Sequence, residues 1–69
     1  MNIGKAIKEI MEHQEISQAD LSKLTGISQT SISAIERGAK RPTDKNFKKI
    51  CKALNVPEPV IYFMAITAA

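Results

Sequence analysis

The side chains whose types and spacing could do chemistry lie in two short polar segments and in the basic segment around them. Gln18 lies near the start of Ser-Gln-Ala-Asp, and Gln29 near the start of Ser-Gln-Thr-Ser. A glutamine amide both donates and accepts hydrogen bonds, so it can bind a phosphate oxygen or pair with the edge of an adenine. Residues 28–52 contain seven lysines and arginines against two acidic residues, a balance of +5 in a chain whose total is +3. This charge and a pI near 9.3 fit a nucleic-acid partner.

Composition excludes several other kinds of site. The chain has 69 residues with one cysteine, Cys51, and one histidine, His13, so neither a disulfide nor a four-ligand zinc site is expected. It has no Ser-His-Asp set, no carboxylate pair and no glycine-rich phosphate loop, so we expect no enzyme, no metal and no cofactor. The longest apolar run, Val60–Ile66, is far shorter than the roughly 20 residues that cross a bilayer. We therefore expect one soluble, cytoplasmic domain over residues 1–69 with no membrane contact.

Five short helices must position these side chains. Apolar residues recur at helical spacing along the whole chain, and no strand pattern, repeat or linker interrupts them. Good N-cap residues precede four of the segments, at Asn2, Ser17, Ser28 and Thr43. Proline in the 57–59 segment is compatible with the first turn of a fifth helix. The sequence predicts an all-α fold, a compact five-helix bundle.

Residues 17–37 predict two helices joined by a minimal turn. Ser17 and Asp20 have the form of a capping box, and Gly26 can end the first helix because glycine tolerates the left-handed conformation. The second helix is expected to end at Gly38. Two helices of about eight to ten residues joined through one glycine cross at a steep angle, which is the geometry of a helix-turn-helix.

The predicted core is aliphatic, because the chain has two Phe, one Tyr and no Trp. Helical spacing directs these residues inward: Ile3, Ile7, Ile10, Met11, Leu21, Leu24, Ile32, Ile35, Phe47, Ile50, Cys51 and Leu54. Four lysines repeat on the opposite side of the fourth helix: Lys45, Lys48, Lys49 and Lys52. We expect them to form a solvated face that adds diffuse attraction for an anionic partner.

The last apolar run would be apolar on all sides of a helix. A monomer cannot bury every face of such a helix, so part of the run is expected to form a two-fold dimer contact. The expected interface residues are Tyr62, Phe63 and Met64. The alternative is a tail that further downstream sequence covers.

Residues 16–42 resemble the helix-turn-helix family of phage repressor and Cro proteins, also called the XRE or Cro/C1 family. The resemblance rests on Ile-Ser-Gln-Ala-Asp-Leu-Ser-Lys-Leu-Thr-Gly-Ile-Ser-Gln-Thr-Ser-Ile-Ser-Ala-Ile-Glu-Arg-Gly, followed by Lys40-Arg41-Pro42. Asn55-Val56-Pro57 also matches the usual entry to the last helix of that family. The resemblance implies a bundle of the lambda-repressor-like DNA-binding type, in which the second helix of the motif lies in the major groove.

The resemblance also implies contacts for individual residues. Gln18 matches a glutamine that holds a backbone phosphate, and Gln29 matches a base-reading glutamine. Thr30 matches a second contact to a base or a phosphate. The implied DNA-binding set is completed by the next positions along the second helix and the basic residues after it: Ser31, Ser33, Ala34, Arg37, Lys40 and Arg41.

Two positions depart from the pattern of that family. Many members pair an arginine of the first helix with the glutamate that is Glu36 here, but Met11 occupies the arginine position. Glu36 must therefore be exposed, paired differently or locally costly. Glu15 occupies a position before the second helix where the family commonly has glycine. Both departures affect the expected local stability and leave the implied DNA face unchanged.

The sequence predicts a transcriptional regulator that binds double-stranded DNA in its major groove with sequence specificity. It is expected to be bacterial or phage-encoded, nucleoid-associated when bound, and to act as a homodimer on a palindromic operator, by default as a repressor. The alternative is an antitoxin-type protein that binds a partner toxin through the 60–66 run and regulates its own operon. A helix-turn-helix used only for protein contacts is disfavoured by Gln18, by Gln29 and by the basic flank, which consists of Arg37, Lys40 and Arg41.

Overall fold

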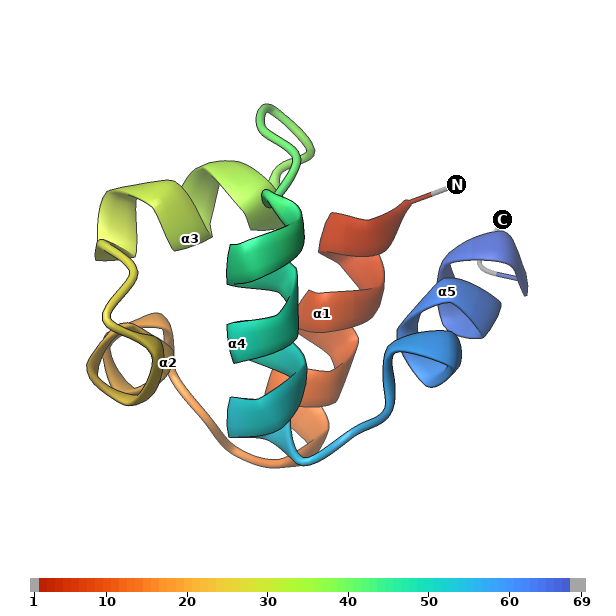
Figure 1. The fold of residues 1–69 in the computed structure, drawn as a ribbon, viewed down its shortest axis with the longest axis horizontal. Helices are drawn as coiled ribbons and strands as arrows, with labels where there is room; N and C mark the ends of the chain where they lie inside the picture. Colours follow the sequence, from red (N-terminus) through yellow and green to blue (C-terminus); the bar gives the residue numbers. More distant parts are fainter. Residues whose placement is uncertain (1, 68–69) are drawn as a thin grey trace.

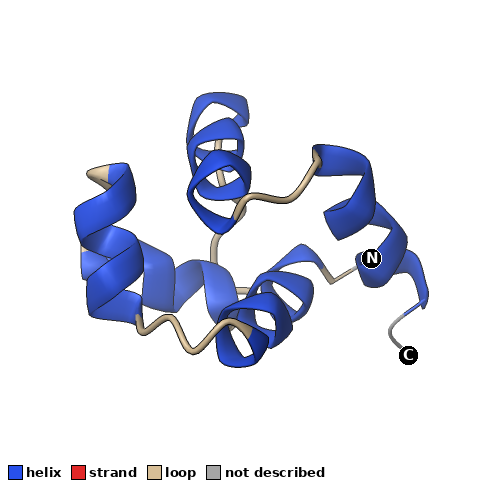
Figure 2. Ribbon diagram, turned by 90° about the horizontal axis from the view of Figure 1, so that it is seen from below, coloured by secondary structure: helices blue, strands red, loops and turns tan. Residues whose placement is uncertain are grey.

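The computed structural model describes residues 2–67, and five α-helices account for most of them (Figure 1). Their bounds are α1 (Ile3–His13), α2 (Gln18–Thr25), α3 (Gln29–Glu36), α4 (Asp44–Leu54) and α5 (Glu58–Thr67). Within residues 2–67 there is no strand, and Figure 2 shows only helices joined by short loops. The all-α five-helix prediction is confirmed.

The predicted N-caps begin the first four helices. The side chain of Asn2 accepts a hydrogen bond from the Lys5 amide at 2.9 Å, and Ser17 accepts one from the Asp20 amide at 3.0 Å. The Asp20 carboxylate accepts in return from the Ser17 amide at 3.2 Å, so the capping box is complete. Ser28 and Thr43 cap α3 and α4 in the same way. Each cap satisfies a backbone amide that the helix leaves free, which fixes where α2 and α3 begin.

Four of the helix ends use a residue with a left-handed backbone, and after α4 this residue is Asn55 with φ 58°. Gly26 and Gly38 have φ values of 76° and 77°, as expected for residues that follow α2 and α3. Glu15 follows α1 with φ 57°, and the Ile16 amide donates to the Met11 carbonyl at 2.8 Å. This hydrogen bond closes a Schellman turn whose left-handed position holds glutamate in place of glycine. The departure from the family pattern at Glu15 is therefore a site of backbone strain.

One aliphatic core fills the space between the helices. It consists of the buried residues Ala6, Ile7, Ile10, Met11, Leu21, Ile27, Ile32, Ile35, Phe47, Ile50, Cys51, Leu54, Ile61 and Ala65. Ile3 is partly buried against it. α1 packs against both α3 and α5, while α4 packs against α2 and α5 (Figure 1). Most of the predicted inward positions are confirmed.

The prediction for Leu24 is wrong, since 62% of this residue is exposed. Leu21 is fully buried, and Thr25 takes the second inward position of α2. The Thr25 hydroxyl donates to the Leu21 carbonyl at 2.7 Å and accepts from the Ile27 amide at 3.2 Å. Because both hydrogen bonds are local, a polar side chain can be buried at a position that the apolar pattern assigns to leucine.

The first turn of α1 connects the two helices on either side of it. Gly4 lies so close to α3 that a Cβ atom at this position would overlap the carbonyl oxygen of Ile35. On the other side, the Asn2 amide donates to the Ala65 carbonyl of α5 at 3.3 Å. The position of α3 relative to α5 is thus set through the N-terminal end of α1.

Candidate nucleic-acid interface

The outer side of α3 is a single polar surface. At about 100° per residue, the positions that face away from the core fall within an arc of about 140°. These positions are Gln29, Thr30, Ser33, Ala34 and Arg37. Ile32 and Ile35 occupy the opposite side and are 1% and 3% exposed. Burial of two isoleucines therefore fixes the rotation of α3 and directs its polar arc to solvent.

The polar arc of α3 meets the start of α2 around one shallow depression. This depression has a volume of about 410 Å³ and is lined by Gln18, Gln29, Thr30, Ser33 and Arg37. Gln18 is the first residue of α2 and Gln29 the first residue of α3. Both amides therefore project from helix N-termini, where the positive end of the helix dipole favours an anion. The structure brings these five predicted residues together.

The remaining basic residues border a second depression, between α1 and the loop that follows α3. Lys40 and Arg41 line this space of about 350 Å³ together with Asn2, Gly4 and Gly38. Lys40 also reaches back to α3, where its Nζ atom donates to the Ser31 hydroxyl at 3.5 Å. Ser31 thus marks the edge of the α3 surface, and the basic flank continues that surface toward α1 and α4. Ala34 lies on the polar arc and lines neither depression.

Glu36 lies at the C-terminal end of α3, where the family commonly has an ion pair. It is half-buried, and its Oε2 atom is buried without a hydrogen-bond partner. Met11, which occupies the arginine position, is 3% exposed and belongs to the core. Of the possibilities that the sequence left open, the structure shows the locally costly one, because a buried carboxylate oxygen lacks a partner.

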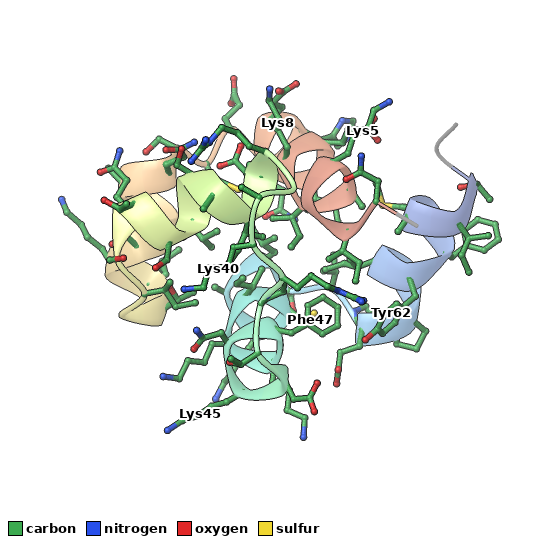
Figure 3. All side chains as sticks on the ribbon, turned by 90° about the horizontal axis from the view of Figure 1, so that it is seen from above. Lys5, Lys8, Lys40, Lys45, Phe47 and Tyr62 are labelled. Carbon is green, nitrogen blue, oxygen red and sulfur yellow. The ribbon has the colours of Figure 1, made fainter. Side chains whose placement is uncertain are left out.

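The outer side of α5 is apolar. Only Ile61 and Ala65 of this helix are buried, whereas the exposed fractions of its large apolar residues are 41% for Val60, 38% for Tyr62, 68% for Phe63 and 71% for Ile66. The Tyr62 ring contacts Phe47 of α4 at 5.2 Å between ring centroids (Figure 3). Of the three residues expected at a dimer contact, Tyr62 and Phe63 are exposed and Met64 is partly buried against the core.

A groove beside α5 was not predicted from the sequence. It has a volume of about 400 Å³ and is lined by Glu9, Ile10, His13, Gln14, Val56 and Met64. Its residues come from α1, the loop before α5 and α5 itself, so no single helical pattern predicts it. The apolar surface of α5 therefore continues into a concave region on the side of Met64.

Three further features of residues 2–67 bear on metal binding, membrane insertion and thiol chemistry. Within residues 2–67, no group of three His, Cys, Asp or Glu side chains could hold a metal ion. In the same range, no helix is both long enough and apolar enough to span a membrane. Cys51 is buried in the core, and this burial raises the pKa of its thiol, which favours an unreactive neutral group.

A sequence model of the helix-turn-helix family matches residues 7–61, which include α2, α3 and the loop between them. The chain belongs to the helix-turn-helix family. Its fold and its motif are those of the Cro/C1-type transcriptional regulators, which are DNA-binding proteins and not enzymes. The resemblance inferred from residues 16–42 is confirmed.

Known helix-turn-helix proteins are similar over nearly the whole chain. An uncharacterized HTH-type transcriptional regulator of Mycobacterium bovis, Mb0023, is 36% identical over 66 residues, which are 96% of this chain and 25% of the relative. The chain thus spans a quarter of the length of that regulator. The DNA-binding domain of the P22 c2 repressor is 29% identical with a TM-score of 0.85, covering 90% of this chain and 82% of that domain. The restriction-modification controller protein C.Esp1396I, as a tetramer with its natural 35-base-pair operator, is 32% identical with a TM-score of 0.83. The match covers 94% of this chain and 86% of the controller protein chain.

Proposed function

We propose that this chain binds double-stranded DNA with sequence specificity and regulates transcription from the site that it occupies. The observation that supports this best is the depression in which the first residues of α2 and α3 meet the polar arc of α3. A polar helix face of this kind fits the major groove, whose base edges offer hydrogen-bond donors and acceptors. The operator complexes of the P22 c2 repressor and C.Esp1396I support DNA as the partner.

The proposed roles divide between base reading and phosphate binding. Gln29 reads an adenine through its amide, and Thr30 makes a second contact to a base or a phosphate. Further along α3, Ser33 and Ala34 face the groove, and Ala34 offers only apolar contact. The residues proposed to hold phosphates are Gln18, Ser31, Arg37, Lys40 and Arg41. Phosphate contacts supply most of the affinity and its salt dependence, whereas the base contacts supply discrimination.

A homodimer on a palindromic operator is the proposed working form. The exposed apolar residues of α5 support it, because such a surface on a small domain is costly unless a partner covers it. A two-fold contact through Tyr62, Phe63 and Met64 would place two α3 helices in successive major grooves, about 34 Å apart. Bound over a promoter, such a dimer would exclude polymerase and repress transcription. We place this activity in the cytoplasm, on the nucleoid.

Selection from a random pool of double-stranded DNA tests the proposal directly. The purified chain at about physiological salt should enrich a palindromic motif with a fixed half-site spacing. Enrichment of single half-sites would contradict the dimer and leave sequence-specific binding in place. Retention of DNA without any enrichment would contradict the proposal, and a protein partner on α5 would then be the better explanation of the fold.

A further inference from the structure

The outer face of α4 carries a row of charge that has no role in base reading. This lysine face consists of Lys45, Lys48, Lys49 and Lys52, and all four side chains are exposed. The opposite side of α4 is buried in the core. Lys52 follows Lys45 by seven positions, so the row extends about 10 Å along the helix axis. The fold therefore presents four positive charges on one side of a single helix.

The lysines of this face repel one another. Lys45 is three and four residues before Lys48 and Lys49, and Lys52 is four and three residues after them. Like charges at these spacings lie one turn apart and destabilise a helix. Asp44 in the first turn is the only acidic residue of α4. A bound row of negative charge would remove this repulsion, whereas in the free protein the lysine face costs stability.

The lysine face is directed away from the proposed operator contacts. α4 begins near the level of α3 and runs steeply away from it (Figure 1), so Lys52 is the most distant of the four lysines. Figure 3 shows Lys45 pointing away from α3, whereas Lys40 lies beside that helix. A duplex that holds α3 in its groove therefore leaves the far end of the lysine face unoccupied.

A phosphate backbone suits this face better than a protein does. Protein interfaces are depleted in lysine and depend on aromatic or arginine anchors, and the lysine face has neither. Phosphates need only point charges in a row, because sequence-independent binding has no requirement for shape.

We propose that the lysine face is a second, sequence-independent binding site for the phosphate backbone of DNA. It engages a duplex segment other than the one held by α3, so a protein bound at its operator can capture another segment of DNA. The operator contact through α3 rests on the proposed function, whereas the contact through the lysine face does not. Capture of a second segment lets the protein pass between segments without first dissociating into solution.

A sandwich-capture experiment tests this second site. The duplex enriched from the random pool is immobilised and loaded with protein, and a short fluorescent duplex of unrelated sequence is then applied. The test variant is Lys48→Gln/Lys49→Gln/Lys52→Gln, which spares Lys45 because it is nearest to the operator surface. The control is Lys5→Gln/Lys8→Gln/Lys23→Gln, whose three lysines are also exposed. Both variants lower the formal net charge from +3 to zero.

We expect the wild-type chain and the control to capture the second duplex, and the test variant to lose at least about tenfold in capture while still loading onto the first duplex. Its thermal midpoint should not fall, because the substitutions remove repulsion. Capture by the test variant at the wild-type level would overturn the proposal, as would wild-type loading without any capture. Binding of polyglutamate to the loaded protein in place of duplex would overturn it too, and would assign the face to an acidic protein. Failure to enrich or load the first duplex would instead count against the proposed function.

Discussion

The outer faces of α3 and α5 are both exposed, yet their chemistry is opposite. α3 buries two isoleucines and presents amides, hydroxyls and Arg37, whereas α5 buries Ile61 and Ala65 and presents Phe63 and Ile66. Water solvates the polar face of α3 at little cost, but it leaves the apolar face of α5 unfavourable. The difference indicates that α3 is suited to a polar ligand and α5 to another apolar surface.

α1 supports both the polar face of α3 and the apolar face of α5. α1 touches α3 where Gly4 approaches Ile35, and it touches α5 where the Asn2 amide bonds to Ala65. The direction of the polar face and that of the apolar face are therefore not independent. In a dimer formed through α5, this connection would set the distance and angle between the two α3 helices.

The largest expected effect comes from breaking that shared support. Gly4→Ala places a methyl group against the Ile35 carbonyl, so α1 and α3 must separate. We expect a loss of about 3 kcal/mol in the free energy of unfolding, measured by urea denaturation. Lys5→Ala on the exposed side of the same turn is the control and should change this energy by less than about 0.5 kcal/mol. Equal unfolding energies for the two variants would contradict the close approach of α1 and α3.

The next effect separates the two faces. Phe63→Glu places a charge on the apolar face of α5, and we expect the dimer dissociation constant to rise at least about 30-fold, or about 2 kcal/mol. Sedimentation velocity measures the change, with Ala19→Glu at an exposed position of α2 as the charge-matched control. Unchanged masses for Phe63→Glu would remove the dimer assignment and leave the account of α3 untouched.

A smaller effect concerns the cap that positions Gln18 at the start of α2. Ser17→Ala removes the acceptor of the Asp20 amide, and we expect a loss of about 1 kcal/mol in the free energy of unfolding. Hydrogen bonds from the Ser17 backbone and then its side chain lower the pKa of Asp20 below its ordinary value of 3.8.

The lowered pKa of Asp20 gives this cap a pH dependence. Because the folded pKa lies below the unfolded one, the contribution of Asp20 is fully present above pH 3.8 and is lost as the pH falls through the folded pKa. The difference in unfolding energy between wild type and Asp20→Asn, which removes the charge of this side chain, should therefore shrink in acid. A constant difference down to the acid limit would contradict the capping box as its source.

The smallest effect is a gain in stability. Glu15→Gly relieves the left-handed strain after α1, offset in part by the greater freedom of glycine in the unfolded chain. We expect the free energy of unfolding to rise by about 0.5 kcal/mol, measured by thermal denaturation. Glu12→Gly inside α1 is the control and should lower it by about 1 kcal/mol. A loss of stability in Glu15→Gly would show that the glutamate side chain makes a compensating contact.

The sequence predicted the features that depend on residues close together in the chain. The caps at Asn2, Ser17, Ser28 and Thr43 need only a side chain and an amide three residues apart, so their residue types predict them. Helical spacing likewise predicted most of the core, including Ile32 and Ile35 of α3, whereas the residues on the outer side of α3 were implied by the resemblance to the family.

Features that depend on distant residues were missed. Leu24 and Thr25 are equally placed for burial on a short helix, and the tertiary surroundings bury Thr25. The approach of Gly4 to Ile35 and the groove beside Met64 each join segments more than 30 residues apart, so no local pattern indicates them. The positive φ of Glu15 was foreseen only as a departure from the family pattern.

The most direct test of the central claim compares Gln29→Ala with Arg41→Ala on the selected duplex and on its single-base variants. Gln29→Ala should weaken binding to the selected duplex by about 1–3 kcal/mol and abolish discrimination at one position of each half-site. Arg41→Ala should weaken all duplexes alike and reduce the slope of log affinity against log salt by about one. Identical profiles for the two variants across the duplex set would contradict the assignment of base reading to α3 and of phosphate binding to its basic flank.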